Sequence, residues 1–248
     1  NFKQLYNTYD TRPMVSFGIA FGGNYTQPYY FERFSAGNSI DVRPEYNAEL
    51  NIEAGIQVSK SITDNVELSL EALYAQYSYS IVQYPTSTVE VNTHESQSAL
   101  SLPLSVNYLI ATGRQFTPYV KLGWQSNILF GANQTASKDF TDGDFESENS
   151  PSVDIMFKRN SYNGAVLIGA GARFQLPLGY AFIDARYNLG VNNLVKEDMR
   201  YPDENSSSQF KELVWSFQAI DDNFRMNQFH FLVGYALPIY NVKKLKTP

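Results

Sequence analysis

Apolar and polar residues alternate one by one along eight separate segments of the chain. In residues 15–22, VSFGIAFG, one set of alternate positions holds Val, Phe, Ile and Phe, and the other holds Ser, Gly, Ala and Gly. A period of two places successive side chains on opposite faces of a β-strand. The chain is therefore predicted to be all-β. The eight segments are residues 15–22, 49–58, 66–75, 100–108, 119–125, 166–174, 181–189 and 229–237.

The segments that connect these strands alternate strictly between short and long. Such a pattern is typical of an antiparallel up-and-down barrel with tight turns at one rim and long loops at the other. In outer-membrane barrels the tight turns face the periplasm, and the long loops face the outside of the cell. Short connections are predicted at 61–65, 111–115 and 176–180, and long ones at 26–44, 81–95, 131–163 and 192–225.

Both ends of such a barrel are expected on the periplasmic side. We divide the chain into a periplasmic N-terminal segment over 1–11, a barrel over 12–240 and a periplasmic tail over 241–248. The chain begins at Asn1 without a charged-then-apolar leader, so we expect a processed form or a fragment of something longer.

Side-chain size indicates which face of the barrel points outward. The apolar face carries bulky rings such as Phe17, Trp124 and Phe231, whereas the polar face carries small residues such as Gly18 and Gly55. An eight-stranded barrel has an interior only just wide enough for its own side chains. We therefore expect the apolar face to contact lipid and the polar face to fill the interior. A soluble lipocalin-like barrel, with the apolar face inside, is the alternative.

Composition excludes several other classes of protein. The chain has no cysteine, which removes disulfides, thiolate metal sites and cysteine nucleophiles. A net charge of −6 gives no support to a nucleic-acid partner. No run approaches the roughly 18 consecutive apolar residues that a membrane-spanning helix needs. We expect the outer membrane of a Gram-negative bacterium as the location, its lipid as one partner, and no cofactor.

Two neighbouring segments carry a family resemblance. Residues 100–108, LSLPLSVNY, and residues 117–123, TPYVKLG, together resemble the "L-x-x-P-L-x-x-x-Y … P-Y-x-x-x-G" core of the PorT-like family of Bacteroidota outer-membrane barrels. The resemblance covers about 30 residues and implies the same barrel type. The family includes a component of a secretion and gliding machinery, and it has no agreed catalytic residues to carry over.

Charged residues on the polar face are expected to pair across the barrel. Unpaired charges in a narrow interior would be very costly, so a hydrogen-bonded ion network is predicted. A narrow path for ions or protons is the alternative. The predicted network consists of Glu49, Glu53, Glu67, Glu71, Lys121, Arg173, Asp184, Arg186 and His230.

Two sets of residues near the long loops are candidates for chemistry. His94 and Ser96 could join a loop aspartate as a catalytic set, but Ser and Asp are abundant in every loop, so no catalytic residue is assigned. Asp142, Asp144 and Glu146 stand at every second position, as Ca²⁺ ligands can. The glycine that an EF-hand loop needs is missing there, so a solvated acidic loop is the preferred interpretation, and no metal site is predicted.

The last long connection contains an apolar stretch, Val214 to Phe217. Its rings Trp215 and Phe217 either pack over the barrel mouth or contact another protein.

We expect a non-enzymatic barrel that serves as an accessory or structural subunit of an outer-membrane complex for secretion, protein insertion or uptake. Its partners would be other outer-membrane or periplasmic proteins. The alternatives are an outer-membrane enzyme with a rim active site near His94, and a small pore.

Overall fold

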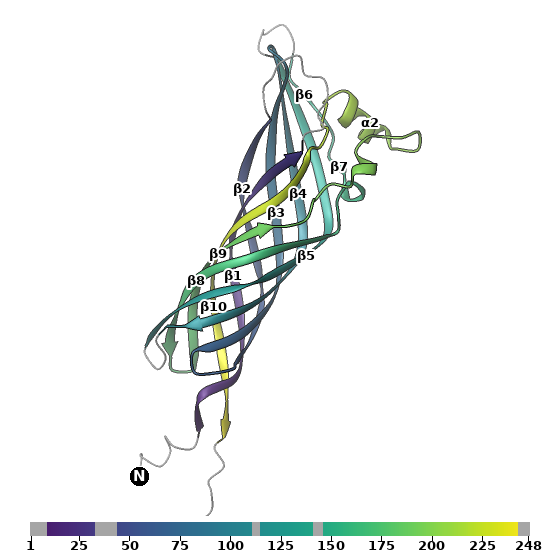
Figure 1. The fold of residues 1–248 in the computed structure, drawn as a ribbon. Helices are drawn as coiled ribbons and strands as arrows, with labels where there is room; N and C mark the ends of the chain where they lie inside the picture. Colours follow the sequence, from purple (N-terminus) through teal and green to yellow (C-terminus); the bar gives the residue numbers. More distant parts are fainter. Residues whose placement is uncertain (1–8, 33–43, 111–114, 141–145, 243–248) are drawn as a thin grey trace, which may run out of the picture.

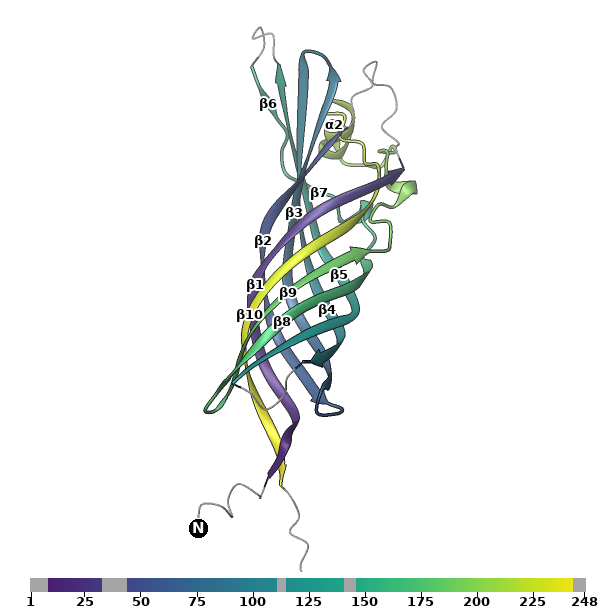
Figure 2. The same cartoon turned by 60° about the vertical axis from the view of Figure 1, so that its left-hand side comes forward.

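Eight long antiparallel strands form a closed ring in the computed structural model, which describes residues 9–32, 44–110, 115–140 and 146–242. Each strand pairs with its neighbours in sequence, and the last pairs with the first. The predicted up-and-down barrel is confirmed (Figures 1 and 2). The strands are β1 (Tyr9–Glu32), β2 (Glu45–Ser61), β3 (Val66–Thr86), β4 (Val89–Leu109), β5 (Phe116–Phe140), β8 (Tyr162–Leu176), β9 (Gly179–Gly190) and β10 (Asn223–Val242).

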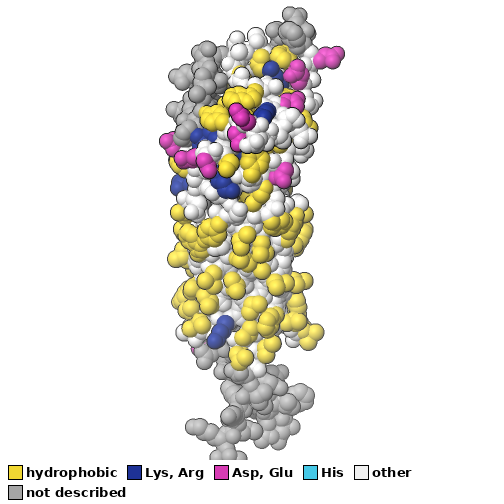
Figure 3. All heavy atoms as spheres, turned by 90° about the vertical axis from the view of Figure 1, so that its right-hand side faces the viewer, with side chains coloured by type: hydrophobic (Ala, Val, Ile, Leu, Met, Phe, Trp, Pro, Cys, Tyr) yellow, Lys and Arg dark blue, Asp and Glu magenta, His cyan; other side chains and the backbone are white. Residues whose placement is uncertain are grey.

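The apolar faces of the strands point outward and form a belt around the barrel. Phe17 is 51% exposed, Leu122 60% and Phe231 50%, whereas the polar-face residues Glu71 and Arg186 are buried. Figure 3 shows one face of the molecule, where hydrophobic side chains cover the lower wall and most charged side chains lie above them. This belt is the surface that meets lipid. Among the described residues, no helix is long and apolar enough to cross a membrane.

Several strands are much longer than a bilayer requires. β3 and β4 each have 21 residues and β5 has 25, against the roughly 9–11 that span a membrane. The prediction of a long loop at 81–95 is wrong, because these residues belong to β3 and β4, which are separated by Ser87 and Thr88 alone. Ile81 and Val91 are buried on the inward face, whereas outward positions such as Asn92 and His94 are polar, because this part of the wall stands above the belt.

Two irregularities in strand pairing change which side chains point inward. The register of β2 against β3 shifts between Ala48 and Glu53. The register of β4 against β5 shifts between Ser98 and Ala99, where Phe130 is the extra residue on β5. Such bulges insert an extra residue and move the following side chains to the other face. The inward face of β5 therefore continues above the bulge with Ala132 and Gln134, which are both buried.

Two connections fold into a cap on the inner side of the extended wall. The first, residues 146–161, contains β6 (Glu148–Asn149), β7 (Val153–Asp154) and the 3-10 helix η1 (Met156–Lys158). The second, residues 191–222, contains the 3-10 helix η2 (Glu197–Met199) and helix α2 (Ser208–Trp215). Ser207 caps α2 by accepting a hydrogen bond from the Phe210 amide. β6 and β7 pair with the upper part of β5, and Figure 1 shows α2 beside β7.

The first and last strands run beyond the rest of the barrel at the short-turn rim. Tyr9 pairs with Val242, and Pro13 pairs with Tyr240. In Figures 1 and 2 the two strand ends lie side by side below the barrel wall. Residues 1–8 and 243–248, most of the segments assigned to the periplasm from the sequence, lie outside the described residues.

Candidate functional site

The interior of the barrel contains a network of buried ion pairs, which we call the lumen network. Nearest the short turns, Arg173 on β8 donates from Nη1 to Glu67 Oε2 on β3 at 2.8 Å, and its Nη2 contacts the other carboxylate oxygen. The guanidinium stacks over the Tyr180 ring, with 4.6 Å from Cζ to the ring centroid. Asn107 donates a further hydrogen bond to Glu67.

A second group lies further along the barrel and links three strands, β3, β5 and β9. Glu71 on β3 accepts hydrogen bonds from Arg186 Nη1 at 2.7 Å and from Lys121 Nζ at 3.3 Å. Lys121 also pairs with Asp184 Oδ2 at 2.6 Å. The Tyr119 hydroxyl donates to the same Asp184 oxygen at 2.8 Å. Each charge thus faces an opposite charge, as burial requires.

A third group surrounds His230, which is fully buried. Its Nδ1 lies 2.8 Å from Glu53 Oε1, and its Nε2 lies 2.8 Å from Asn188 Nδ2. Asn188 Nδ2 also donates to Gln125, whose side chain bonds to Asn127. With Asn188 donating to Nε2, the imidazole carries its proton on Nδ1 and donates it to Glu53.

The structure brings together eight of the nine residues expected in the interior, as the three groups above. Glu49 does not join them, so the prediction that it belongs to the lumen network is wrong. The bulge after Ala48 turns Glu49 to the partly exposed face, where Ser78 Oγ and Ser80 Oγ donate to its carboxylate at 2.8 and 3.0 Å. His94 Nδ1 lies 3.0 Å from the same carboxylate.

A second buried ion cluster, which we call the mouth cluster, joins the wall to the cap. Arg159 donates to Glu95 Oε1 from Nε at 2.7 Å and to Asp221 Oδ2 from Nη1 at 3.0 Å. Lys158 Nζ lies 2.7 Å from Asp221 Oδ2. Burial alone would raise the pKa of Asp221, but the charges of Arg159 and Lys158 outweigh it and hold that pKa well below its usual range. Burial lowers the pKa of Lys158, although Asp221 opposes this.

The mouth cluster is not predicted by the sequence patterns. Arg159 lies 64 residues from Glu95 and 62 from Asp221, and all three fall within connections that are predicted to be loops. The one signal present was the combination of adjacent basic residues, Lys158 and Arg159, with the adjacent acidic residues Asp221 and Asp222. Sequence spacing alone does not pair them.

Apolar packing closes the space around the mouth cluster. Phe210, Leu213 and Val214 of α2 are buried against the wall, together with Phe217. Phe217 is 3% exposed, which assigns it to packing over the mouth, whereas Trp215 is 61% exposed. Trp215 stacks on Tyr201, with ring centroids 6.4 Å apart. A second apolar layer lies between the mouth cluster and the lumen network, formed by Tyr77, Tyr79, Leu129, Leu194, Val195 and Phe224 with small neighbours.

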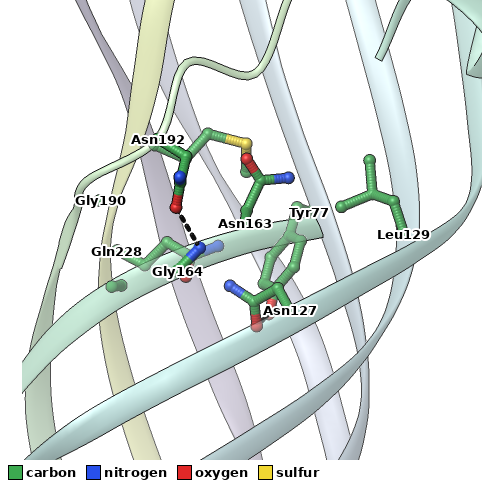
Figure 4. Close-up of a pocket in the computed structure, with 10 residues that line it drawn as sticks. Tyr77, Asn127, Leu129, Asn163, Gly164, Gly190, Asn192 and Gln228 are labelled. Atoms are coloured by element: carbon green, nitrogen blue, oxygen red, sulfur yellow. Dashed lines mark hydrogen bonds between the residues drawn. The ribbon is translucent and has the colours of Figure 1, made fainter. Parts of the chain in front are cut away.

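A small pocket marks the place where the chain leaves the barrel wall (Figure 4). β8 begins and β9 ends here, so Gly164 lacks a strand partner for its amide. Asn192 Oδ1 accepts that hydrogen bond at 2.8 Å. A Cβ at Gly164 would lie 2.2 Å from the Trp124 ring, so only glycine fits without a shift. The pocket is lined by amides, Tyr77 and apolar atoms without a charged residue, and we assign it no catalytic role.

An open groove crosses the outer face of the wall above the belt, and we call it the outer groove. It holds about 790 Å³ of space, part of it open to solvent, and its lining includes Glu49, Ser80, Asn92, His94, Thr135 and Ser137. Burial raises the pKa of Glu49, but hydrogen bonds from Ser78 and Ser80 and the charge of His94 outweigh it and lower that pKa. The groove thus has a carboxylate, an imidazole and several neutral polar groups.

The remaining sequence candidates are not brought into a site. Ser96 lies on β4 two residues from His94, and the acidic partner of His94 is Glu49 rather than a loop aspartate. Asp142 and Asp144 lie outside the described residues, and Glu146 is exposed. Within the described ranges, no group of three or more His, Asp or Glu side chains is placed to hold a metal ion.

Comparison with solved structures finds other outer-membrane barrels at low sequence identity. OprG from Pseudomonas aeruginosa is 10% identical, with a TM-score of 0.40 over 93% of this chain and 98% of that one. Neisserial surface protein A is 14% identical, with a TM-score of 0.35 over 90% and 97%. The outer membrane protease OmpT from Escherichia coli is 8% identical, with a TM-score of 0.41 over 94% and 98%.

Comparison with curated protein sequences finds no match. The profile of one family, described as the outer membrane protein beta-barrel domain, matches residues 3–196, which is well over half of the chain. The closed ring, the outward apolar belt and this match place the protein in the outer membrane of a Gram-negative bacterium. The chain belongs to the outer membrane protein beta-barrel domain family.

Proposed function

We propose that this protein is a non-enzymatic, non-conducting barrel that serves as a structural or accessory subunit of an outer-membrane complex. The observation that carries the proposal is the closure of the interior. Three groups of ion pairs, an apolar layer, the mouth cluster and α2 follow one another along the barrel. A molecule with a filled interior acts through its surfaces rather than by passing a solute.

The surface of the cap supports contact with another protein. Trp215 is 61% exposed, and its stacking partner Tyr201 and the nearby Met199 are each 45% exposed. These side chains stand on the cap, away from the lipid-facing belt. Exposed aromatic residues outside the membrane are typical of protein contact surfaces. Suitable partners are other outer-membrane proteins, and the complex would serve secretion, protein insertion or uptake.

Site-specific photocrosslinking tests the cap surface. The chain has two tryptophans, Trp215 on the cap and Trp124 in the belt, which provide a matched pair. A photoreactive phenylalanine at position 215 should crosslink in native membranes to one protein that also co-purifies in gentle detergent. The same group at position 124 should crosslink to lipid. A monomer in gentle detergent, with no protein adduct at position 215, would contradict the proposal.

Planar-bilayer recording tests the closed interior. The wild-type barrel should show no conductance, because each layer of the interior is packed. Steady single-channel currents from the purified protein would instead support the small pore that the sequence left open.

One observation favours an enzyme as the second candidate function. The His94–Glu49 pair is open to solvent, and a carboxylate-oriented imidazole can act as a general base. The described residues show no hydrogen bond from a serine or threonine hydroxyl to His94, so the pair lacks a nucleophile. Full cellular function of a His94→Ala variant would remove this candidate, and loss of function with normal folding would favour it.

We also propose that the chain belongs to the PorT-like branch of Bacteroidota barrels. The support is the pair of motifs in residues 100–108 and 117–123, which lie on the paired strands β4 and β5. Pro103 of the first motif is buried and pairs with Gln125. Isolation of the native complex and identification of its members would test this assignment together with the subunit role.

A further inference from the structure

The outer groove is built from two rows of polar side chains that run across the strands. In one row, Ser80 on β3 pairs with His94 on β4, which pairs with Thr135 on β5. In the other, Asn92 on β4 pairs with Ser137 on β5, which pairs with Asn149 on β6. Neighbouring strands lie about 4.8 Å apart, so each row presents polar groups at that spacing. This is the scale of hydroxyls on opposite sides of a sugar ring.

The groups in the rows complement neutral hydroxyls rather than ions. Hydroxyl and amide side chains both donate and accept hydrogen bonds. His94 Nδ1 lies 3.0 Å from Glu49 Oε1, and a neutral imidazole that donates this hydrogen bond has Nε2 as an acceptor. Asn92 adds a half-buried side-chain amide to the lining of the groove. The single carboxylate, with no Lys or Arg in the lining, disfavours phosphate or sulfate.

The position of the groove indicates where such a ligand would come from. Ser80 lies six residues along β3 from Tyr74, which is 46% exposed in the belt. Six residues correspond to about 20 Å along a tilted strand. The groove therefore stands just above the lipid-facing surface, on the long-loop side of the membrane. There the outer leaflet of a Gram-negative cell carries glycolipid headgroups.

We propose that the outer groove binds neutral sugar hydroxyls of the outer-leaflet glycolipid. The sugar hydroxyls bond to His94 and to the side-chain amide of Asn92, and the hydroxyls of Thr135 and Ser137 complete the contacts. Binding here involves neither the barrel interior nor the exposed side chains around Trp215, so it is independent of the subunit role proposed above.

The two histidines of the chain allow a direct test by NMR. His94 lies in the groove, and His230 is fully buried in the lumen network. Protein labelled with ¹³C at histidine Cε1 is placed in phosphatidylcholine nanodiscs. One arm adds oligosaccharide released from purified lipopolysaccharide, and a second arm uses nanodiscs that contain intact lipopolysaccharide. The His94 signal should shift in a saturable way in at least one arm, while the His230 signal stays in place.

Variants separate groove binding from a general effect on the barrel. Asn92→Leu combined with Ser137→Ala should weaken binding about tenfold, because two hydrogen bonds are lost. Ser96→Ala, on the same face of β4 but outside the groove lining, should bind like the wild type. An unchanged His230 signal shows in each variant that the barrel is folded.

The two arms also distinguish the sources of the sugar. A shift with released oligosaccharide means that the sugar alone is recognised, and a shift only with intact lipopolysaccharide means that membrane anchoring adds to it. Nanodiscs with phosphatidylglycerol control for negative charge. No His94 shift in either arm, an equal shift with phosphatidylglycerol alone, or unchanged binding in the double variant would overturn the proposal.

Discussion

Each buried charge of the lumen network depends on a partner from a distant strand. Arg186 on β9 holds Glu71 on β3 at 2.7 Å, and its Nη2 lies 4.0 Å from Glu53 on β2. Removing one partner of a buried ion pair leaves an uncompensated charge. Replacing both partners by apolar residues of similar volume leaves no unpaired charge. The effect of substituting one of these charged residues on the stability of the barrel therefore depends on whether its partner is also replaced.

We predict that Arg186→Leu lowers the free energy of unfolding by about 3–5 kcal/mol, because Glu71 loses its strongest partner. Arg186→Leu combined with Glu71→Leu should restore most of this loss. Urea unfolding in detergent, followed by the gel mobility of folded and unfolded forms, measures both. A loss in the double variant equal to the sum of the losses in Arg186→Leu and in Glu71→Leu would show that the two side chains act separately.

At the scale of elements, the cap and the wall are held together by the mouth cluster. Asp221 has a pKa well below that of an unfolded aspartate because Arg159 and Lys158 lie against it. A carboxylate whose pKa is depressed in the folded state stabilises that state above its unfolded pKa, about 3.9. That contribution declines as the pH falls below this value. Attachment of the cap should therefore weaken in acid.

Trp215 reports this loosening when Trp124 is replaced by phenylalanine. We predict that acrylamide quenching of Trp215 stays constant from pH 7 to about 4 and rises below it. Asp221→Asn should raise quenching already at pH 7, because Lys158 and Arg159 then lose a buried counter-charge. Asp203→Asn changes an exposed carboxylate of the same connection and serves as the control. A pH profile unchanged by Asp221→Asn would exclude the mouth cluster as the attachment.

The elements also show what the sequence could and could not predict. The alternation of apolar and polar residues located all eight strands. Lipid requires apolar side chains on the outer face of each strand, and the narrow interior requires small or polar side chains on the inner face. It failed above the belt, where the outward positions are polar, as at Ser80, and the inward positions are apolar, as at Tyr77 and Tyr79. The bulge before Glu53 reversed the side on which Glu49 lies, and no residue type marks it. Arg159, Glu95 and Asp221 meet through tertiary folding, which local patterns do not encode.

At the scale of the whole molecule, several layers along the barrel axis fill the interior, and no single element closes it alone. The lumen network lies below the apolar layer of Tyr77 and Phe224, and both lie below α2. We predict that replacing residues 201–219 by a short Gly-Ser linker leaves the barrel folded and still without conductance. Planar-bilayer recording of this variant and the wild type is the measurement. Channel openings in the variant alone would identify the cap as the seal.

The pairing of β1 with β10 has a consequence for how the protein is made. Ser16 pairs with Pro238, so the ring closes through contacts between the two extremes of the chain. Until β10 has been synthesised and delivered, β1 and β9 each present an unpaired edge, which can add strands from other chains. A sheet that formed before β10 was added would therefore be open to pairing with strands of other chains. Periplasmic chaperones that shield open β-edges would act during that interval.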